Sequence, residues 1–295
     1  MRRVLKWVGI LLGVILILVI LAVSYIYIVT GSQLNKTYAV PLESIELPDD
    51  ISTMDRGYPQ VMLNVCRDCH GQNFAGQIME DEPLMARLVA PNLTRGKGGK
   101  GAHFTTEDWV RALRHGVDED GTSLIVMPAD MFSHLSDADL GYIIAYLQNV
   151  PPVDNELPEI RLGPMGRLFI LQQPILIAEL IDHDAPRPPE PEPGITLEYG
   201  KYLTGVCTIC HGEDYAGGEQ VGAGLNITPG GDLAHWTEAD FFHAMRTGER
   251  PDGKLLDPEM MPVRIIGQFT DAELQAIWLF LQSLPPLESK LEPES

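Results

Sequence analysis

Cysteine is scarce in this sequence. Only four of the 295 residues are cysteine, and all four lie in two short stretches, NVCRDCHGQNF (64–74) and GVCTICHGEDY (205–215). A small secreted domain that is held together by disulfides usually carries its cysteines throughout the chain. The clustering therefore indicates two special sites and leaves no cysteine for a disulfide framework.

Basic residues are also few, with 21 lysines and arginines against 41 acidic residues and a formal net charge of −20. A surface of this sign repels nucleic acid and anionic lipid head groups, so the sequence excludes a nucleic-acid-binding function. The same charge suits the attraction of a basic protein partner, or it serves only to keep the protein soluble.

Each cysteine cluster contains a C-x-x-C-H motif, for which three interpretations compete. A redox dithiol is expected in a βαβ context, and a shared zinc site would join cysteine pairs 141 positions apart and leave both histidines unused. In c-type haem attachment, the two thiols add to the porphyrin vinyl groups and the histidine binds the iron. We adopt this third interpretation, which predicts two covalently attached haem c groups. Their attachment residues are Cys66, Cys69, His70, Cys207, Cys210 and His211.

The N-terminal stretch predicts a membrane anchor. Residues 7–29 contain no charge, and the bases Arg2, Arg3 and Lys6 precede them. The run is long enough to span a bilayer, and the positive-inside rule places the N-terminus in the cytoplasm. A cleaved signal peptide is the alternative, but the apolar run is longer than an ordinary signal peptide has. Under either interpretation, the remainder of the chain is exported across the cytoplasmic membrane.

The rest of the chain is an internal repeat. The stretch 102–121 aligns with 234–253, and 127–152 aligns with 261–286 with 10 of 26 positions identical. Each haem motif therefore begins a unit of the size of one small domain. The predicted parts are a cytoplasmic stub (1–6), a transmembrane signal anchor (7–29), an extended linker (30–52), a first domain (53–152), an interdomain linker (153–195), a second domain (196–286) and an acidic tail (287–295).

The pattern within each repeat is helical. Helices are expected over 59–66 and 197–207, and from capping residues at Thr105, Ser136 and Thr270. No alternating stretch is long enough to predict a sheet. The apolar part of the linker, 168–181, is expected to pack between domains, with a helix on the membrane surface as the alternative. Residues 182–194 are rich in proline and acidic, and they are expected to form a stiff spacer.

The repeat also selects the second axial ligands. Met127 and Met261 fall at equivalent positions, each followed by proline and each upstream of the last helix of its repeat. A methionine thioether that occupies the sixth coordination position of the iron leaves no open site there, which favours electron transfer over ligand binding. Met131 and Met260 have no equivalent in the other repeat and are expected to serve packing. The predicted iron ligands are His70, Met127, His211 and Met261.

With these pieces in this order, the chain resembles a class I cytochrome c, in a membrane-anchored tandem dihaem form. The haem domains resemble those of the cytochrome subunits of bacterial alcohol and aldose dehydrogenases. The resemblance rests on C-x-x-C-H-G, PNLT, HGVDEDG, MPADMF, LSDADLGYIIAYL and PPV, and it covers 53–152 and 196–286. It implies an all-α fold of two tandem cytochrome c-like domains behind the transmembrane helix. Those subunits carry three haems, whereas this chain has two motifs and its anchor at the front.

The resemblance also implies roles for residues around the haem. A proline carbonyl of the family accepts a hydrogen bond from the haem-binding histidine, and Pro91 occupies that place in the first repeat. The second repeat has Leu225 there, whose carbonyl can serve equally. A glycine of the first helix packs against an aromatic residue of the last helix in the family. The candidate pairs are Gly57 with Tyr146 and Gly200 with Phe280.

Several further residues have open or structural roles. His103 and His235 occupy equivalent positions, where a propionate partner, an iron ligand and a surface residue are all possible. Trp109 and Trp236 either lie at the porphyrin edge or belong to the core. The histidines without an equivalent are expected to be structural, and they are His115, His134, His183 and His243.

The predicted function is that of an electron carrier, which is not an enzyme and needs no small-molecule substrate. Single electrons would pass on the periplasmic or outer face of the cytoplasmic membrane, from a dehydrogenase or quinol-oxidising complex to a terminal oxidase or small soluble carrier. Two alternatives stay open. A dihaem peroxidase-like enzyme would need one open, high-spin haem, and a haem-based sensor would need a cytoplasmic output domain.

Overall fold

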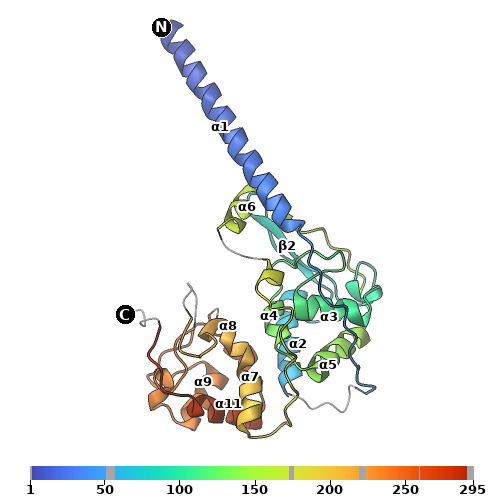
Figure 1. Ribbon diagram of the computed structural model, residues 1–295, viewed down its shortest axis with the longest axis vertical. Coiled ribbons are helices and arrows are strands. Elements are labelled where there is room, and N and C mark those ends of the chain that lie inside the picture. The colour runs from blue at the N-terminus through green and yellow to red at the C-terminus, as the bar shows by residue number, and fades with distance from the viewer. Residues whose placement is uncertain (1, 51–56, 173–175, 219–223, 259, 291–295) are drawn as a thin grey trace. The chain divides into compact units, whose positions relative to one another are not determined.

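A computed structural model describes residues 2–50, 57–172, 176–218, 224–258 and 260–290 (Figure 1). The described chain is mostly helical with one small sheet. The longer helices are α1 (Arg2–Leu34), α2 (Gly57–His70), α3 (Thr106–His115), α5 (Asp137–Asn149), α9 (Glu238–Thr247) and α11 (Asp271–Ser283). Shorter helices are α4 (Ala129–Ser133), α6 (Pro164–Ile170), α7 (Leu197–Leu203), α8 (Thr208–His211) and α10 (Val263–Ile266). Single 3-10 turns are η1 (Lys100–Ala102), η2 (Ile177–Glu179), η3 (Thr204–Cys207) and η4 (Asp232–His235).

The chain divides into two compact units. Unit 1 comprises Met1–Glu43, Cys69–Ala129 and Pro151–His183, and unit 2 comprises Ser44–Asp68, Asp130–Val150 and Asp184–Ser295. The boundary passes through α2, so each unit is defined by contacts and does not follow the sequence repeat. The predicted domains, 53–152 and 196–286, therefore remain a prediction. Residue 53 and the end of the acidic tail lie outside the described residues.

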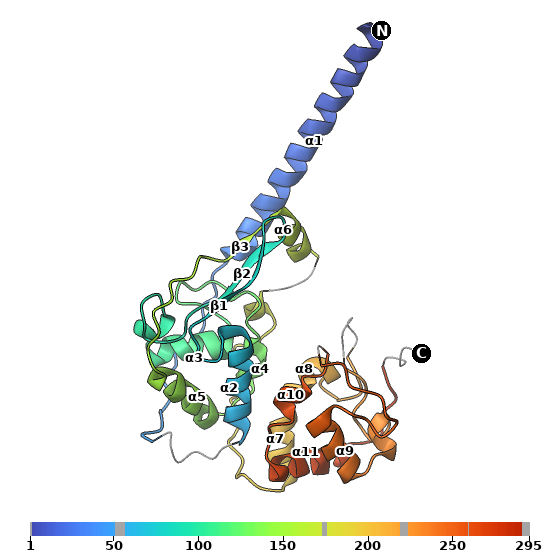
Figure 2. The same cartoon turned by 180° about the vertical axis from the view of Figure 1, so that it is seen from behind.

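Helix α1 is the N-terminal anchor candidate. It is long and apolar enough to cross a membrane, and it contains the whole predicted span 7–29. It continues to Leu34, so the first residues of the predicted extended linker are helical. Beyond it, residues 39–50 form no regular element. Figures 1 and 2 show α1 as a single long helix that projects from the rest of unit 1.

A small antiparallel sheet corrects the all-α expectation. Strands β1 (Gln77–Glu82), β2 (Ala86–Ala90) and β3 (Arg161–Leu162) pair in that order. Every residue of β1 is exposed, so its sequence QIMEDE has no alternation of buried and exposed side chains. Strand β3 is too short to carry a pattern. Backbone pairing with β2 holds both strands, and hydrophobic alternation does not reveal such pairing.

The helix starts expected from the sequence are confirmed. Thr105 and Thr270 each cap a helix through a capping box with the acidic residue three positions later, and Thr237, which was not predicted, does the same. Ser136 accepts a hydrogen bond from the backbone N–H of Asp139 at the start of α5. The predicted helix 197–207 is divided into α7 and η3, and α8 follows at once. The predicted helix 59–66 is the central part of α2.

Within unit 2, a close helix crossing depends on a glycine. A Cβ placed on Gly200 of α7 would collide with the backbone carbonyl oxygen of Ala276 in α11 and come within 2.8 Å of the Phe280 Cβ. The expected pairing of Gly200 with Phe280 is therefore confirmed. Gly57 differs from expectation, because the space beside it is occupied by the carboxylate of Glu273. That carboxylate is buried and also accepts a hydrogen bond from the Tyr199 hydroxyl.

Replacing Gly200 with alanine is expected to destabilise unit 2. The added methyl must push α7 away from a backbone carbonyl of α11, which cannot rotate aside, and such overpacking typically costs about 1–3 kcal/mol. Urea unfolding followed by circular dichroism measures the loss. Gly194→Ala is the matched control, since the nearest atom to its new methyl is 3.9 Å away. Equal stability of the two variants would contradict a close α7–α11 crossing.

Candidate functional site

The first C-x-x-C-H motif forms the last turn of α2. Cys66 is 4% exposed and His70 is 5% exposed. The His70 Nδ1 lies 2.8 Å from the carbonyl oxygen of Pro91, to which it donates when protonated. That bond leaves Nε2 as the nitrogen for a metal, and it raises the basicity of the ring. Burial lowers the pKa of His70 and so favours the neutral imidazole that binds iron.

The second motif has the same arrangement despite a different local helix. Cys207 ends η3, and Cys210 and His211 lie in α8. The His211 Nδ1 lies 2.6 Å from the carbonyl oxygen of Leu225. The expectation that a leucine carbonyl can replace that of the proline is therefore confirmed in geometry. Burial again lowers the pKa of this histidine.

The loops that follow the two histidines fold alike. Phe74 and Tyr215, four residues after each histidine, both adopt the left-handed region, with φ 58° and 62°. The histidine carbonyl then accepts a backbone hydrogen bond of 2.9 Å, from Gly76 in one loop and Gly217 in the other. A Cβ on Gly76 would lie 2.6 Å from the backbone of the Pro91 loop, so only glycine allows this approach. The second sequence therefore reproduces the backbone as well as the motif.

Met127 and Met261 also occupy matching loops. Each lies two residues before a short helix, α4 or α10, and each carbonyl accepts a hydrogen bond from the residue at that helix start, at 2.8 and 2.7 Å. Both side chains are half-buried, whereas Met260 is half-exposed. Val126, directly before Met127, has a φ of 69°, which is strained for a β-branched residue. The role of both methionines as iron ligands stays a prediction.

The chemistry of the second cysteine pair argues against a redox dithiol. Burial, with a smaller contribution from the neighbouring Cys210, raises the pKa of Cys207 to about 12. Burial also raises the pKa of Cys210. Catalytic dithiols require a thiolate of lowered pKa, and these thiols are instead held neutral. All four cysteines are free of disulfides.

A shared zinc site gains no support from the geometry. In the described parts of the chain, no three or more histidine, cysteine or acidic side chains are grouped so that they could hold a metal ion. Each cysteine pair has its own adjacent histidine in the sequence.

Comparison with known proteins agrees with this arrangement. Residues 54–147 match the family model described as "Cytochrome C oxidase, cbb3-type, subunit III". These residues, which contain the first C-x-x-C-H motif, are similar to a cytochrome c domain. Covalently bound haem c is the cofactor that this similarity implies.

The similarity of this chain to curated relatives extends over both repeats. The fructose dehydrogenase cytochrome subunit of Gluconobacter japonicus is 25% identical over 291 residues, covering 90% of this chain and 58% of the relative. The alcohol dehydrogenase (quinone) cytochrome c subunit of Gluconacetobacter polyoxogenes is 27% identical over 281 residues, covering 82% of this chain and 58% of the relative. The corresponding subunit of Gluconobacter oxydans is 26% identical over 278 residues, covering 80% and 55%. The chain thus spans little more than half the length of these relatives.

A buried indole of α3 fits a haem carboxylate. Trp109 is 2% exposed, and its Nε1 has no hydrogen-bond partner within the described residues. A buried donor without an acceptor is costly, so such an atom indicates a missing partner. A propionate of a haem attached at Cys66 and Cys69 is an acceptor of the required kind. The repeat could not have revealed this, since the equivalent residue of the second repeat is Phe241.

Trp109→Phe is expected to lower the midpoint potential of the first haem without loss of the fold. The second repeat already has phenylalanine at this position, so the shape is tolerated. Losing the N–H leaves the propionate charge less compensated and favours the ferric iron. The shift is expected to be on the order of tens of millivolts, where ~59 mV is a tenfold change for a one-electron couple. A spectroelectrochemical titration measures it, with Trp278→Phe of α11 as the control; an unchanged potential would leave Trp109 as ordinary core.

His103 and His235, which occupy equivalent positions in the two repeats, both lie at the surface of the chain. His103 is exposed, and its Nε2 lies 3.0 Å from Glu119 in a cluster that also contains Lys100. His235 is exposed in η4. These positions favour the surface interpretation over an iron ligand. A contact not expected from the sequence joins His115 and His183, whose Nδ1 atoms are 3.2 Å apart across 68 positions.

Proposed function

We propose that this cytochrome carries two covalently attached haem c groups and passes single electrons between them on the outer face of the cytoplasmic membrane. The first haem is held by Cys66, Cys69 and His70, with Met127 as the sixth ligand. The second haem is held in the same manner. Its residues are Cys207, Cys210, His211 and Met261.

One observation carries this proposal, namely that both motif histidines are oriented in the same way. Each donates its Nδ1 hydrogen to a backbone carbonyl of the following loop, at 2.8 Å for His70 and 2.6 Å for His211. A cysteine pair that only stabilised the fold would need no such alignment of its neighbouring histidine. The alignment fixes the tautomer that a metal-binding imidazole requires, and it occurs in both repeats.

The residues of the chain then have positioning tasks and no bond-making ones. When bound, haem supplies an iron that cycles between the ferric and ferrous states. The thiols would attach the group covalently, and His70, which is buried, and His211, which is half-buried, would each supply one ligand to it. Met127 and Met261 would supply the other ligands and keep small molecules and water from the iron. A protein with these tasks sets potentials and needs no proton transfer at a substrate.

The membrane and the charge define where the carrier works. Helix α1 would span the cytoplasmic membrane once with its N-terminus inside, so that the haem domains face the periplasm or the exterior. The net charge of −20 favours a basic redox partner in solution. Attachment to the membrane keeps the carrier close to membrane-bound donors.

The names of the relatives support a dehydrogenase as electron donor. Those relatives are the cytochrome subunits of a fructose and of a quinone-linked alcohol dehydrogenase. By analogy, this chain would accept electrons from a dehydrogenase or a quinol-oxidising complex. It would deliver them to a terminal oxidase or a small soluble carrier. No small-molecule substrate is involved at the chain itself.

An intact-mass measurement tests the dihaem state. The full chain is produced in a host that attaches c-type haem, purified in detergent and unfolded in acid, which leaves thioether-linked haem on the protein. We expect a mass increase of two haem groups and one haem in each tryptic peptide that contains a motif. A single haem, on either peptide, would overturn the proposal.

A further inference from the structure

An exposed apolar surface lies where the anchor helix enters unit 1. It consists of Leu84 and Met85 at the turn between β1 and β2, and of Met165, Leu168 and Phe169 on α6; we call these five residues the apolar collar. Their exposed fractions are 61%, 46%, 54%, 38% and 50%. Large apolar side chains that are exposed together indicate a surface for a partner or a membrane.

The collar is joined firmly to the end of α1. The Arg167 guanidinium of α6 lies 4.5 Å from the ring centroid of Tyr27 and donates a hydrogen bond of 2.9 Å to the Thr30 hydroxyl. Thr30 is fully buried by these contacts. One turn further on, Leu34 packs against the small core formed by Ala86, Leu162 and Ile170. The anchor is therefore part of the fold of unit 1 and not a loose tether.

The two pieces of the collar also hold each other. The backbone N–H of Gly163 donates to the carbonyl of Met85, and that of Met165 donates to Leu84, each at 2.9 Å. Gly163 and Gly166 approach the backbone of the hairpin turn so closely that a Cβ on either would collide with a carbonyl oxygen. The turn and α6 thus form one rigid surface. Figures 1 and 2 both show α6 beside the lower end of α1.

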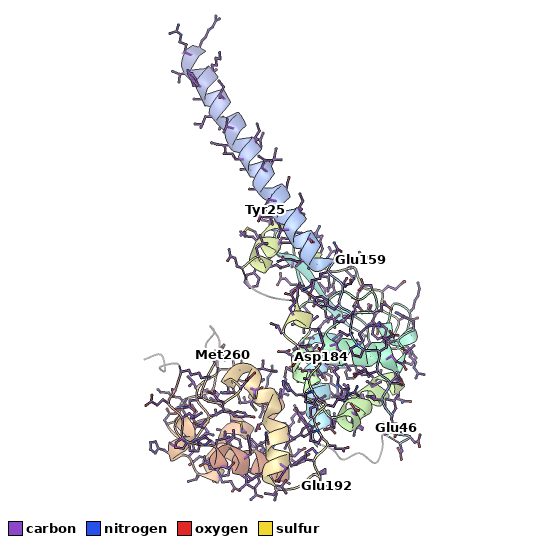
Figure 3. The ribbon with its side chains drawn as sticks, viewed as in Figure 1. Tyr25, Glu46, Glu159, Asp184, Glu192 and Met260 are labelled. Carbon is purple, nitrogen blue, oxygen red and sulfur yellow. The ribbon has the colours of Figure 1, made fainter. Side chains whose placement is uncertain are left out.

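The position along α1 places the collar at the depth of a membrane interface. The apolar run ends at Val29, and α6 contacts α1 between Tyr27 and Leu34. At 1.5 Å per residue, these contacts cover about 10 Å of helix, which is comparable to the head-group zone in which interfacial helices lie. Tyr25, labelled in Figure 3 just before α6 meets the helix, and Tyr27 are the aromatic residues expected at that level.

The local charge on the α6 side of the collar agrees with this placement, whereas Glu80, Asp81 and Glu82 of β1 are exposed beside the turn that bears Leu84. The chain carries a net charge of −20, yet residues 160–172 contain no acidic residue and two arginines, Arg161 and Arg167. An acidic surface would be repelled by phospholipid phosphates, whereas a basic one with exposed apolar side chains suits them. The acid-free stretch coincides with the helix that bears three of the collar residues.

We propose that the apolar collar inserts into the head-group and upper acyl region of the bilayer that α1 spans. The anchor and the collar together then hold unit 1, which contains His70 and Met127, against the membrane. The occupant is phospholipid and not a second protein. The proposal depends on α1 as the span but not on how many haems the chain carries.

Photo-crosslinking of the full chain tests this placement. p-Benzoylphenylalanine replaces Phe169 in one variant and Met165 in another, and each purified protein is reconstituted into vesicles of phosphatidylethanolamine and phosphatidylglycerol. Intact mass after irradiation reports lipid adducts. The same replacement at Ile28, which is 71% exposed on α1, reports whether the span itself meets lipid.

The matched negative control is Leu42, which is 68% exposed and apolar like the collar. It lies between Tyr38, whose N–H bonds to Gly121, and Glu43, which pairs with Arg114. It therefore lies along another part of unit 1. We expect lipid adducts at positions 28, 165 and 169 and none at position 42.

Two results would overturn the proposal. The first is lipid adducts at position 28 without any at 165 and 169. The second is that the same variants, irradiated in cell membranes, crosslink through 165 and 169 to another protein and not to lipid. Haem absorbance of each variant, compared with the unmodified protein, confirms that it has folded before irradiation.

Discussion

Replacing Met127 or Met261 with leucine is expected to remove the sixth ligand from one haem iron and to leave the other haem six-coordinate. Leucine preserves the volume of the side chain but has no sulfur to bind the metal. The affected haem should become high-spin and bind carbon monoxide after reduction. One of the two haems per chain should therefore show a carbon monoxide shift. Its midpoint potential should fall by on the order of 100 mV or more, within the ~0.8 V range that axial ligands set. Absorption spectroscopy and a redox titration measure both effects.

The neighbouring methionines supply matched controls for this experiment. Met260 is directly adjacent to Met261 but is 50% exposed, and Met131 lies in α4 four positions after Met127. Leucine at either control position should leave both haems six-coordinate and unresponsive to carbon monoxide. If the control at Met260 opens the second haem and Met261→Leu does not, the ligand assignment from the sequence repeat is wrong.

Replacing Cys207 and Cys210 together with serine is expected to remove one haem from the chain. Serine hydroxyls do not add to the vinyl groups, so the second site loses its covalent attachment while the first is unaffected. The haem absorbance per chain should fall by half. Electron throughput from a dehydrogenase to a soluble acceptor should fall much more, because the route through two haems is then interrupted.

The reciprocal variant, with Cys66 and Cys69 replaced by serine, distinguishes the two sites. It should also retain half of the haem absorbance, with a different midpoint potential for the haem that remains. Haem quantification per chain and titration of each variant test this pair of expectations. Complete loss of haem from either double variant would mean that the two sites do not mature independently.

Much of the site could be predicted because its residues act through local spacing. Two cysteines and a histidine within five positions define an attachment site wherever the chain places them. The caps at Thr105 and Thr270 lie three residues from their acidic partners and are readable from the sequence alone. The bond from His211 to Leu225 was predictable because it uses a backbone carbonyl, which every residue at that position supplies.

Other features were hidden because they depend on residues far apart in the chain. The sheet joins β2 to β3 by backbone pairing, and the exposed β1 has no hydrophobic pattern. The hydrogen bond from Arg167 to Thr30 joins residues 137 positions apart, and Arg167 also contacts the ring of Tyr27. The described part of residues 168–181 belongs to unit 1, and its packing between domains stays a prediction. Trp109 was ambiguous, because only its burial reveals that its N–H lacks an acceptor.

The most direct test of the carrier function is the spectrum of the purified full chain in detergent, before and after carbon monoxide. The ferric protein should show the near-infrared band of a thioether ligand, and dithionite should give sharp α-bands from two haems. Carbon monoxide should then leave the reduced spectrum unchanged, because both irons are closed by His70 with Met127 and by His211 with Met261. A carbon monoxide shift in either haem, or a high-spin ferric band, would contradict the account and favour a peroxidase-like enzyme.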